Sequence, residues 1–148
     1  MSFDLRDPAF HAYAGTVIVT CLHMVLLDSF GGVVRVKTKT VVNPEDAATV
    51  AKGADVVKAD PDAVARVMRA HRNLVANGVP FLLLCGLWMS FSPSFTWVAA
   101  VGGTFVIARL LHSISYVREA QPWRTLFFVV GQLAMLTVIV QIARGLLG

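Results

Sequence analysis

Between residues 74 and 108 the sequence reads LVANGVPFLLLCGLWMSFSPSFTWVAAVGGTFVIA, which is 35 residues without a charged side chain. A helix that crosses a membrane needs about 20 apolar residues. The stretch therefore has room for two such helices, and the uncharged segment 90–93 (SFSP) marks the tight turn between them. This pattern predicts an integral membrane protein.

The composition of the whole chain agrees with this prediction. Of the 148 residues, 56% are hydrophobic and 15% are charged, and the mean hydropathy is +0.67. A soluble domain is about 25% charged, so the composition argues against a soluble protein, and it excludes a disordered chain. We attribute the net charge of +4 to membrane topology and anionic lipid rather than to nucleic acid. Cys21 and Cys85 lie far apart in apolar runs and form no metal-binding or disulfide pattern.

Four helices are expected outward from this stretch, at about 10–34, 62–91, 96–117 and 125–147. Asp60, Pro61 and Asp62 open the second helix with a cap candidate, a proline and an acid in the first turn. The charged segments 35–61 and 118–124 are expected to be aqueous loops. The predicted fold class is all-α: residues 1–148 form one domain, a four-helix bundle that spans the membrane.

An even number of spans puts both termini on one side of the membrane and both charged loops on the other. Of the 13 Lys and Arg residues, ten belong to the loop side: Arg35, Lys37, Lys39, Lys52, Lys58, Arg66, Arg69, Arg72, Arg118 and Arg124. Because cytosolic loops carry the excess of Lys and Arg, loops 35–61 and 118–124 are predicted to be cytosolic.

Charged residues inside a span are costly and often functional. In the third predicted helix, Arg109, His112 and Tyr116 share one face. A structural reading, in which Arg109 is a cation paired with a carboxylate or with helix-end carbonyls, is equally open. Asp28 is the acid within a predicted span, and no pattern in the sequence accounts for it.

A second polar face lies on the second predicted helix, where Arg66, Arg69 and Asn73 are spaced i, i+3, i+7 and Arg72 lies close by. Taken one at a time, these cations would simply meet lipid headgroups. If the two faces converge near Arg124 and Lys37, they form a cationic pocket at the cytosolic boundary. Because guanidinium groups bind carboxylates in a bidentate manner, such a pocket suits a small anion with several carboxylates. The sequence contains no metal-ligand spacing, no Walker loop and no GxGxxG motif.

Several motifs resemble those of one family. The second-helix segment 60–73 (DPDAVARVMRAHRN) with 80–82 (PFL), the third-helix segment 109–116 (RLLHSISY) and the loop segment 122–124 (PWR) are similar to the signatures of the MAPEG family, the membrane-associated proteins in eicosanoid and glutathione metabolism. The first-loop segments 33–35 (VVR) and 43–47 (NPEDA) match as well.

The resemblance implies a homotrimer in the lipid bilayer that binds glutathione between neighbouring subunits and acts on a lipophilic electrophile or hydroperoxide. By position, it implies that Arg124 stabilises the glutathione thiolate, that Thr125 donates to the sulfur and that Asp46 supports one of these two. The remaining residues that it implies for glutathione binding or for the polar core around it are Arg35, Arg69, Arg72, Asn73, Arg109, His112 and Tyr116.

The sequence departs from the family pattern at two positions. Ala76 stands where the family has a glutamate that is expected to help bind the peptide, and Phe128 stands where a tyrosine is expected. Both changes remove polar contacts. Three functional readings follow: a glutathione-dependent transferase, peroxidase or isomerase; a non-catalytic trimer that binds glutathione or lipid; and a small transporter or channel subunit, for which no inverted repeat gives support.

Overall fold

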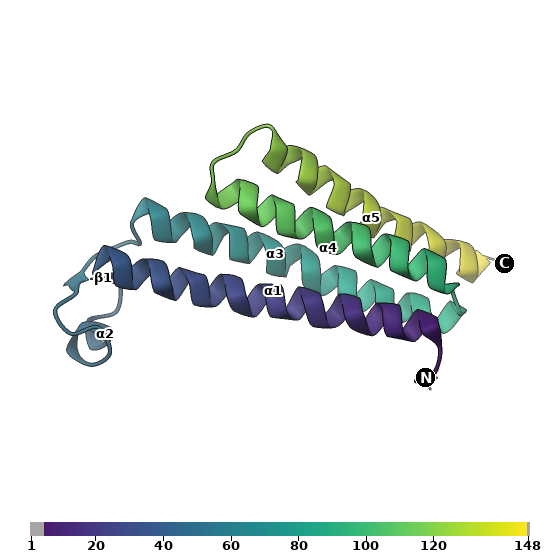
Figure 1. Cartoon of the computed structure of the whole chain (residues 1–148), viewed down its shortest axis with the longest axis horizontal. Coiled ribbons are helices and arrows are strands. Elements are labelled where there is room, and N and C mark those ends of the chain that lie inside the picture. The colour runs from purple at the N-terminus through teal and green to yellow at the C-terminus, as the bar shows by residue number, and fades with distance from the viewer. Residues whose placement is uncertain (1–4, 148) are drawn as a thin grey trace.

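The computed structural model describes residues 5–147 and consists of four long helices that run alternately up and down (Figure 1). Their bounds are Pro8–Thr38 for α1, Asp62–Trp88 for α3, Phe95–Val117 for α4 and Trp123–Leu147 for α5. All four are long and apolar enough to cross a membrane. Both ends of the chain lie at one end of the bundle, as the even number of predicted spans requires (Figure 1).

The first helix is longer than the sequence pattern predicted. It begins at Pro8, because the Asp7 side chain accepts a hydrogen bond from the Ala9 backbone N–H at 2.8 Å and caps it. It ends at Thr38, and Lys39 follows in the left-handed conformation with φ 51°. Arg35 is therefore on the last turn of α1 and not in the loop where we expected it.

The segment after α1, which was predicted to be an aqueous loop, is folded into a small lobe. It contains the strands β1 (Thr40–Val41) and β2 (Asp55–Val56), which pair in parallel, and the short helix α2 (Pro44–Ala48). These strands and this helix are too short for a hydrophobic period to reveal them, so no sequence pattern predicted the lobe.

The start of α3 also differs from its prediction. Pro61 occupies the capping position without a side-chain cap. Asp60, the expected cap, instead accepts hydrogen bonds from Arg35 Nε and Nη2 at 3.1 and 2.9 Å. The pair therefore joins the end of α1 to the start of α3. At its other end α3 continues as a 3₁₀ turn, Met89–Phe91, and Pro80 lies inside the helix.

The packing between α1 and α3 depends on two close approaches. A Cβ added at Gly31 would lie 2.8 Å from Met68 Sδ, and one added at Gly78 would lie 2.5 Å from Met24 Cε. These contacts fix the register of the antiparallel pair. On the other side of α3, the rings of Phe81 and Phe105 stack with centroids 3.7 Å apart and connect it to α4.

The four helices differ in how much of their surface the protomer covers. In an apolar 18-residue segment of each helix, 50% of the residues are buried in α4 and 17% in α1. Large apolar side chains of α1, such as Ile18 at 65% and Val25 at 61% exposure, point away from the bundle. A single copy of the chain therefore leaves α1 with a wide apolar face for lipid or for another subunit.

Candidate functional site

The centre of the candidate site is Arg109, which is 1% exposed although it carries a charge. Its Nη1 donates to the Oδ1 atom of Asn73 on α3 at 3.3 Å. Its guanidinium carbon lies 5.1 Å from the ring centroid of Phe105 and 5.3 Å from that of Phe128. Both distances are within the range of cation–π attraction. Neither of the two ion pairs formed within residues 5–147 involves Arg109.

The rest of the Arg109 guanidinium has no hydrogen-bond partner: Nε and Nη2 are buried and unpaired within the described chain. These atoms lie against Gly131 of α5, where an added Cβ would be 2.9 Å from each of them. Gly131 thus provides the space that the guanidinium occupies. The sequence-based reading of a cation paired with a carboxylate or with helix-end carbonyls does not describe this arrangement, in which an amide and two aromatic rings surround the charge.

Two further polar residues extend the network, and the sequence analysis missed both. Asn77 donates through Nδ2 to the Asn73 carbonyl at 2.7 Å, and Gln132 of α5 donates through Nε2 to Asn77 Oδ1 at 2.5 Å. Both residues carry an amide side chain inside an apolar run, and such a side chain in a membrane usually forms a hydrogen bond with another helix. This pattern could have indicated their contact. The network therefore links α3, α4 and α5.

Toward the loop end of the same helices, His112, Tyr116 and Arg124 come together as predicted. The ring of His112 meets the Tyr116 ring edge-on at 5.6 Å and the Phe128 ring at 6.0 Å. The Arg124 guanidinium carbon lies 4.7 Å from the centroid of the Tyr116 ring. We define the site cluster as Asn73, Arg109, His112, Tyr116 and Arg124.

Arg124 and Thr125 also share a neighbour, Gln121. With the Gln121 amide turned so that both neighbours are satisfied, its oxygen accepts from Arg124 Nη2 at 2.6 Å and its nitrogen contacts Thr125 Oγ1 at 3.1 Å. Both residues are in the first turn of α5. A helix start carries partial positive charge, so Arg124 and the helix end present positive potential at the same place.

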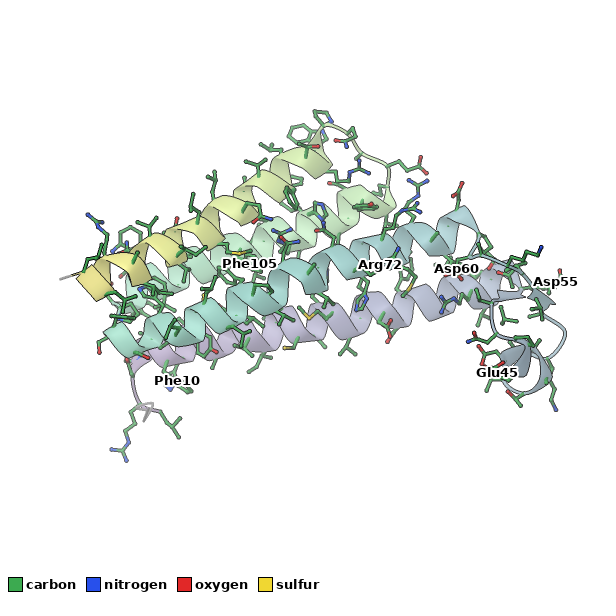
Figure 2. The ribbon with its side chains drawn as sticks, turned by 180° about the vertical axis from the view of Figure 1, so that it is seen from behind. Phe10, Glu45, Asp55, Asp60, Arg72 and Phe105 are labelled. Carbon is green, nitrogen blue, oxygen red and sulfur yellow. The ribbon has the colours of Figure 1, made fainter. Side chains whose placement is uncertain are left out.

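Four predicted residues lie elsewhere in the protomer. Arg69 and Arg72 are exposed on α3, and Figure 2 shows Arg72 in the half of the bundle that leads to the lobe. Asp46 is in α2, where it accepts a hydrogen bond from Asn43 Nδ2 at 3.1 Å. Arg35 is paired with Asp60. Although Arg72 directly precedes Asn73 in the chain, no hydrogen bond or ion pair within residues 5–147 joins any of these four side chains to those of the site cluster.

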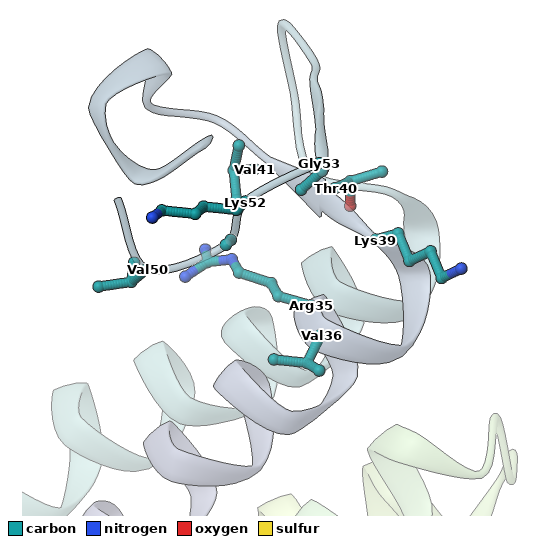
Figure 3. Close-up of a pocket in the computed structure, with 10 residues that line it drawn as sticks. Arg35, Val36, Lys39, Thr40, Val41, Val50, Lys52 and Gly53 are labelled. Atoms are coloured by element: carbon teal, nitrogen blue, oxygen red, sulfur yellow. The ribbon is translucent and has the colours of Figure 1, made fainter. Parts of the chain in front are cut away.

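Arg35 lines a separate cavity of about 300 Å³ between the end of α1 and the lobe. Figure 3 shows its side chain extending toward Val50 and Lys52, whereas the side chain of Lys39 points away. The cavity is thus built from the lobe and the last turns of α1 rather than from α4 and α5. Within the described residues, no group of three or more His, Cys, Asp or Glu side chains is placed to hold a metal ion.

Sequence similarity to known proteins identifies the family of this chain. The sequence model of the MAPEG family matches residues 13–144. The chain belongs to the MAPEG family. It is 33% identical over 130 residues to microsomal glutathione S-transferase 1 of Homo sapiens, covering 86% of this chain and 84% of the relative. The same protein of Mus musculus is 35% identical over 140 residues, covering 93% and 88%.

A second kind of MAPEG relative is prostaglandin E synthase of Macaca fascicularis, which is 30% identical over 145 residues, covering 95% of this chain and 92% of the relative. Family membership together with the four apolar helices identifies an integral, multi-pass membrane protein. In this MAPEG protein, the site cluster offers two guanidinium groups and neutral hydrogen-bonding groups. Such a set suits an anion that bears carboxylates.

Proposed function

We propose that the protein is a membrane-embedded, glutathione-dependent transferase or peroxidase in which Arg124 activates the glutathione thiol. The relatives' names support the choice of glutathione. The observation that carries the proposal is the position of the Arg124 guanidinium at the start of α5, over the Tyr116 ring and beside Thr125.

The chemistry follows from the charges at this place. A free thiol has a pKa near 8.5 and is mostly protonated at neutral pH, and neighbouring cations and a helix start lower that pKa. Each unit of lowering corresponds to about 1.4 kcal/mol in favour of the thiolate. The thiolate then attacks an electrophilic carbon and displaces its leaving group. Alternatively it attacks the terminal oxygen of a hydroperoxide, which breaks the O–O bond and gives glutathione sulfenic acid and an alkoxide that takes up a proton to leave as an alcohol; a second glutathione then converts the sulfenic acid to the disulfide and water. Because the site lies among spanning helices, a lipid-soluble substrate can approach from the bilayer, which supplies proximity.

The proposal includes a homotrimer. Arg35 does not reach the site cluster within its own copy, and α1 leaves a wide apolar face uncovered. If α1 of one copy packs against α5 or α4 of the next, Arg35 approaches the neighbour's cluster and that apolar face is buried. We expect Arg35 to come from one subunit and Arg72, Asn73 and Arg124 to come from the other. Light scattering in mild detergent measures the assembly, and a monomer that still binds glutathione would contradict it.

The sidedness of the loops is part of the same proposal. Both charged loops, 35–61 and 118–124, are proposed to be cytosolic. A cysteine placed at Lys52 or Gln121 is expected to react with an impermeant thiol reagent from the cytosolic side, and a cysteine at Ser92 from the other side. Labelling of positions 52 and 92 from the same side would exclude this topology.

The test of the reaction uses the purified protein in detergent with glutathione and an electrophilic dye. We expect conjugation of the dye, and an ultraviolet titration of bound glutathione is expected to show a lowered thiol pKa. Arg124→Ala should raise that pKa and reduce turnover tenfold or more, which corresponds to about 1.4 kcal/mol. Thr125→Val keeps the shape of the side chain and should cost less, since one neutral hydrogen bond contributes about 1 kcal/mol.

The second candidate is a non-catalytic trimer that binds glutathione or lipid. Two observations favour it: Ala76 and Phe128 stand where the family pattern has a glutamate and a tyrosine. Both readings predict glutathione binding, but they differ in the state of the sulfur. Tight binding of glutathione with an unshifted thiol pKa, and no conjugation of the dye, would favour the binding protein over the enzyme.

A further inference from the structure

Glutathione carries one positively charged group, and the site cluster contains no acidic side chain that could bind it. The tripeptide has two carboxylates, a thiol and one ammonium group. The cluster supplies cations and neutral groups, and the sequence contains no Asp or Glu between Ala63 and Arg118 or after Glu119. An ammonium placed among guanidinium groups without a counter-charge is repelled by like charge. A complete site for glutathione therefore needs a carboxylate from elsewhere.

Three acids near this end of the bundle already have partners, and three others, Glu45, Asp55 and Asp62, lie in the lobe or at the first residue of α3. Glu119 pairs with Arg66 at 3.0 Å, Asp60 pairs with Arg35, and Asp46 accepts from Asn43 in the lobe. Asp28 belongs to neither of the two ion pairs formed within residues 5–147. It is exposed on α1, in a helix that is long and apolar enough to cross the membrane. An acid inside a membrane span is costly unless a partner compensates it.

The register of α1 and α3 gives the depth of Asp28 in the bundle. On α1 it lies between Met24, which packs against Gly78, and Gly31, which packs against Met68. Asp28 is therefore level with the part of α3 between residues 68 and 78. Asn73, which accepts the hydrogen bond from Arg109, lies at the middle of that part. Asp28 is thus at the depth of Asn73 and Arg109, the deeper end of the site cluster.

Within residues 5–147, Asp28 forms no ion pair with the cluster of its own copy. Its neighbours Leu27 and Gly31 are buried against the bundle, whereas Asp28 is exposed. Arg35 follows seven residues later, on the same face of α1 and about 10 Å further along the axis. A surface that brings Arg35 to the cluster of a neighbouring copy therefore brings Asp28 with it.

We propose that Asp28 of one copy binds the ammonium group of the glutathione held by the site cluster of the next copy. This inference rests on the proposed function, because it concerns the same site. The carboxylate of Asp28 supplies the negative charge that Ala76 on α3 lacks. The pairing also places a cation beside Asp28 at the same depth in the membrane. Bound glutathione and the second subunit then together offset the free-energy cost of an acid in a spanning helix.

The first experiment compares glutathione with its desamino analogue, glutaryl-cysteinyl-glycine, which lacks only the ammonium group. Dissociation constants are measured in detergent for the unmodified protein and for Asp28→Asn. The unmodified protein is expected to prefer glutathione tenfold or more, and Asp28→Asn is expected to bind both ligands alike. Asp28→Glu should restore the preference. Asp55→Asn, which neutralises an exposed acid in the lobe, is the matched control and should keep it.

The outcomes separate this inference from the function on which it rests. If the unmodified protein binds neither ligand, the proposed function fails and the inference fails with it. If the protein binds glutathione but Asp28→Asn still prefers it over the desamino analogue, the function stands and the inference is wrong. Equal binding of both ligands by the unmodified protein would also exclude an acid at the ammonium.

The second experiment tests whether the acid comes from another copy. Chains carrying Asp28→Asn are co-expressed with chains carrying Arg124→Ala. When the acid and the arginine come from different copies, random mixing leaves about one site in four with both groups, because each choice is between two equal alternatives. Those sites should recover conjugating activity and the preference for glutathione. A chain carrying both substitutions is the control and should recover nothing, and absence of recovery in the mixture would place Asp28 and Arg124 in the same copy.

Discussion

Arg109 and Arg35 are both arginines on membrane-spanning helices, yet the protein surrounds them in opposite ways. Arg35 is partly exposed at 39% of its side chain and forms a two-bond ion pair with Asp60. Arg109 is buried among an amide and two aromatic rings, with Nε and Nη2 unpaired in the described chain. One cation is satisfied by its own chain, whereas the other keeps hydrogen-bonding capacity unused.

The two arginines differ in how much an anionic ligand can stabilise them. A cation that already has its carboxylate gains little from a second anion. A buried cation without a carboxylate lowers the stability of the ligand-free protein, and an anion that arrives nearby returns part of this cost. The site cluster therefore gains more from an anionic ligand than the lobe does. The following changes test this difference between the two regions.

Substitution of Arg109→Met is expected to have the largest effect. It removes the uncompensated charge while keeping an unbranched side chain, so the ligand-free protein should become more stable by about 1–4 kcal/mol. The stabilisation by glutathione should shrink at the same time. Thermal unfolding in detergent, with and without glutathione, measures both quantities. A lower Tm of the ligand-free variant would show that the amide and the rings already compensate the charge of Arg109.

A smaller disturbance of the same region is Gly131→Ala. The new methyl group would lie 2.9 Å from Arg109 Nε and Nη2, and these atoms have little room to move. Overpacking of this kind costs about 1–3 kcal/mol. Gly103→Ala is the matched control, because nothing lies within 4 Å of a Cβ at that position. Equal unfolding temperatures of the two variants would mean that Arg109 has another place to go.

Phe128→Tyr restores the hydroxyl that the family pattern has at this position. It tests how strongly the site cluster binds an anion. The Phe128 ring lies 6.0 Å from His112 and 5.3 Å from the Arg109 guanidinium carbon, so a hydroxyl on it enters the cluster. We expect glutathione to bind about fivefold more tightly, which corresponds to one net hydrogen bond of about 1 kcal/mol. Calorimetry in detergent measures the change, and unchanged or weaker binding would contradict it.

The smallest effect is expected in the lobe, from Asp60→Asn. The substitution removes the charge that pairs with Arg35, but both side chains are partly open to solvent, at 39% and 22% exposure. Exposed ion pairs contribute about 0.2–1 kcal/mol. The unfolding temperature should therefore fall only slightly. A loss as large as that of Gly131→Ala would show that the lobe holds α1 and α3 together more strongly than an exposed pair allows.

The sequence predicted the features that depend on long runs of residues. Thirty-five uncharged residues between Leu74 and Ala108 require two helices with a turn, and α3 and α4 are those helices. The same holds for the helical face of Arg109, His112 and Tyr116, because the spacing i, i+3, i+7 fixes a common face whatever surrounds it. The sequence predicted a convergence of two polar faces near Arg124 and Lys37, but not the contact of Arg124 with the Tyr116 ring that the structure shows.

The sequence did not predict what surrounds each charge, because this depends on contacts between distant segments. No local pattern connects Arg35 with Asp60, which lies twenty-five residues later. The space that Gly131 leaves for Arg109 depends on the rotation of α5 against α4. Asn77 and Gln132 were detectable as polar residues in apolar runs, but their partnership needs the packed structure. The roles of Arg124, Asp46 and Thr125 in catalysis, and of the other predicted residues in glutathione binding, stay predictions.

Both ion pairs formed within the described residues 5–147 lie at the lobe end of the bundle, Arg35 with Asp60 and Arg66 with Glu119. At the opposite end, Phe91 packs against Gly145 without charge. Ionic strength should therefore weaken both of these pairs. At about 1 M salt the Debye length falls to about 3 Å, so the lobe and the loop before α5 should exchange their amide hydrogens faster. Raising the salt concentration would thus loosen the region around the first turn of α5 without melting the bundle.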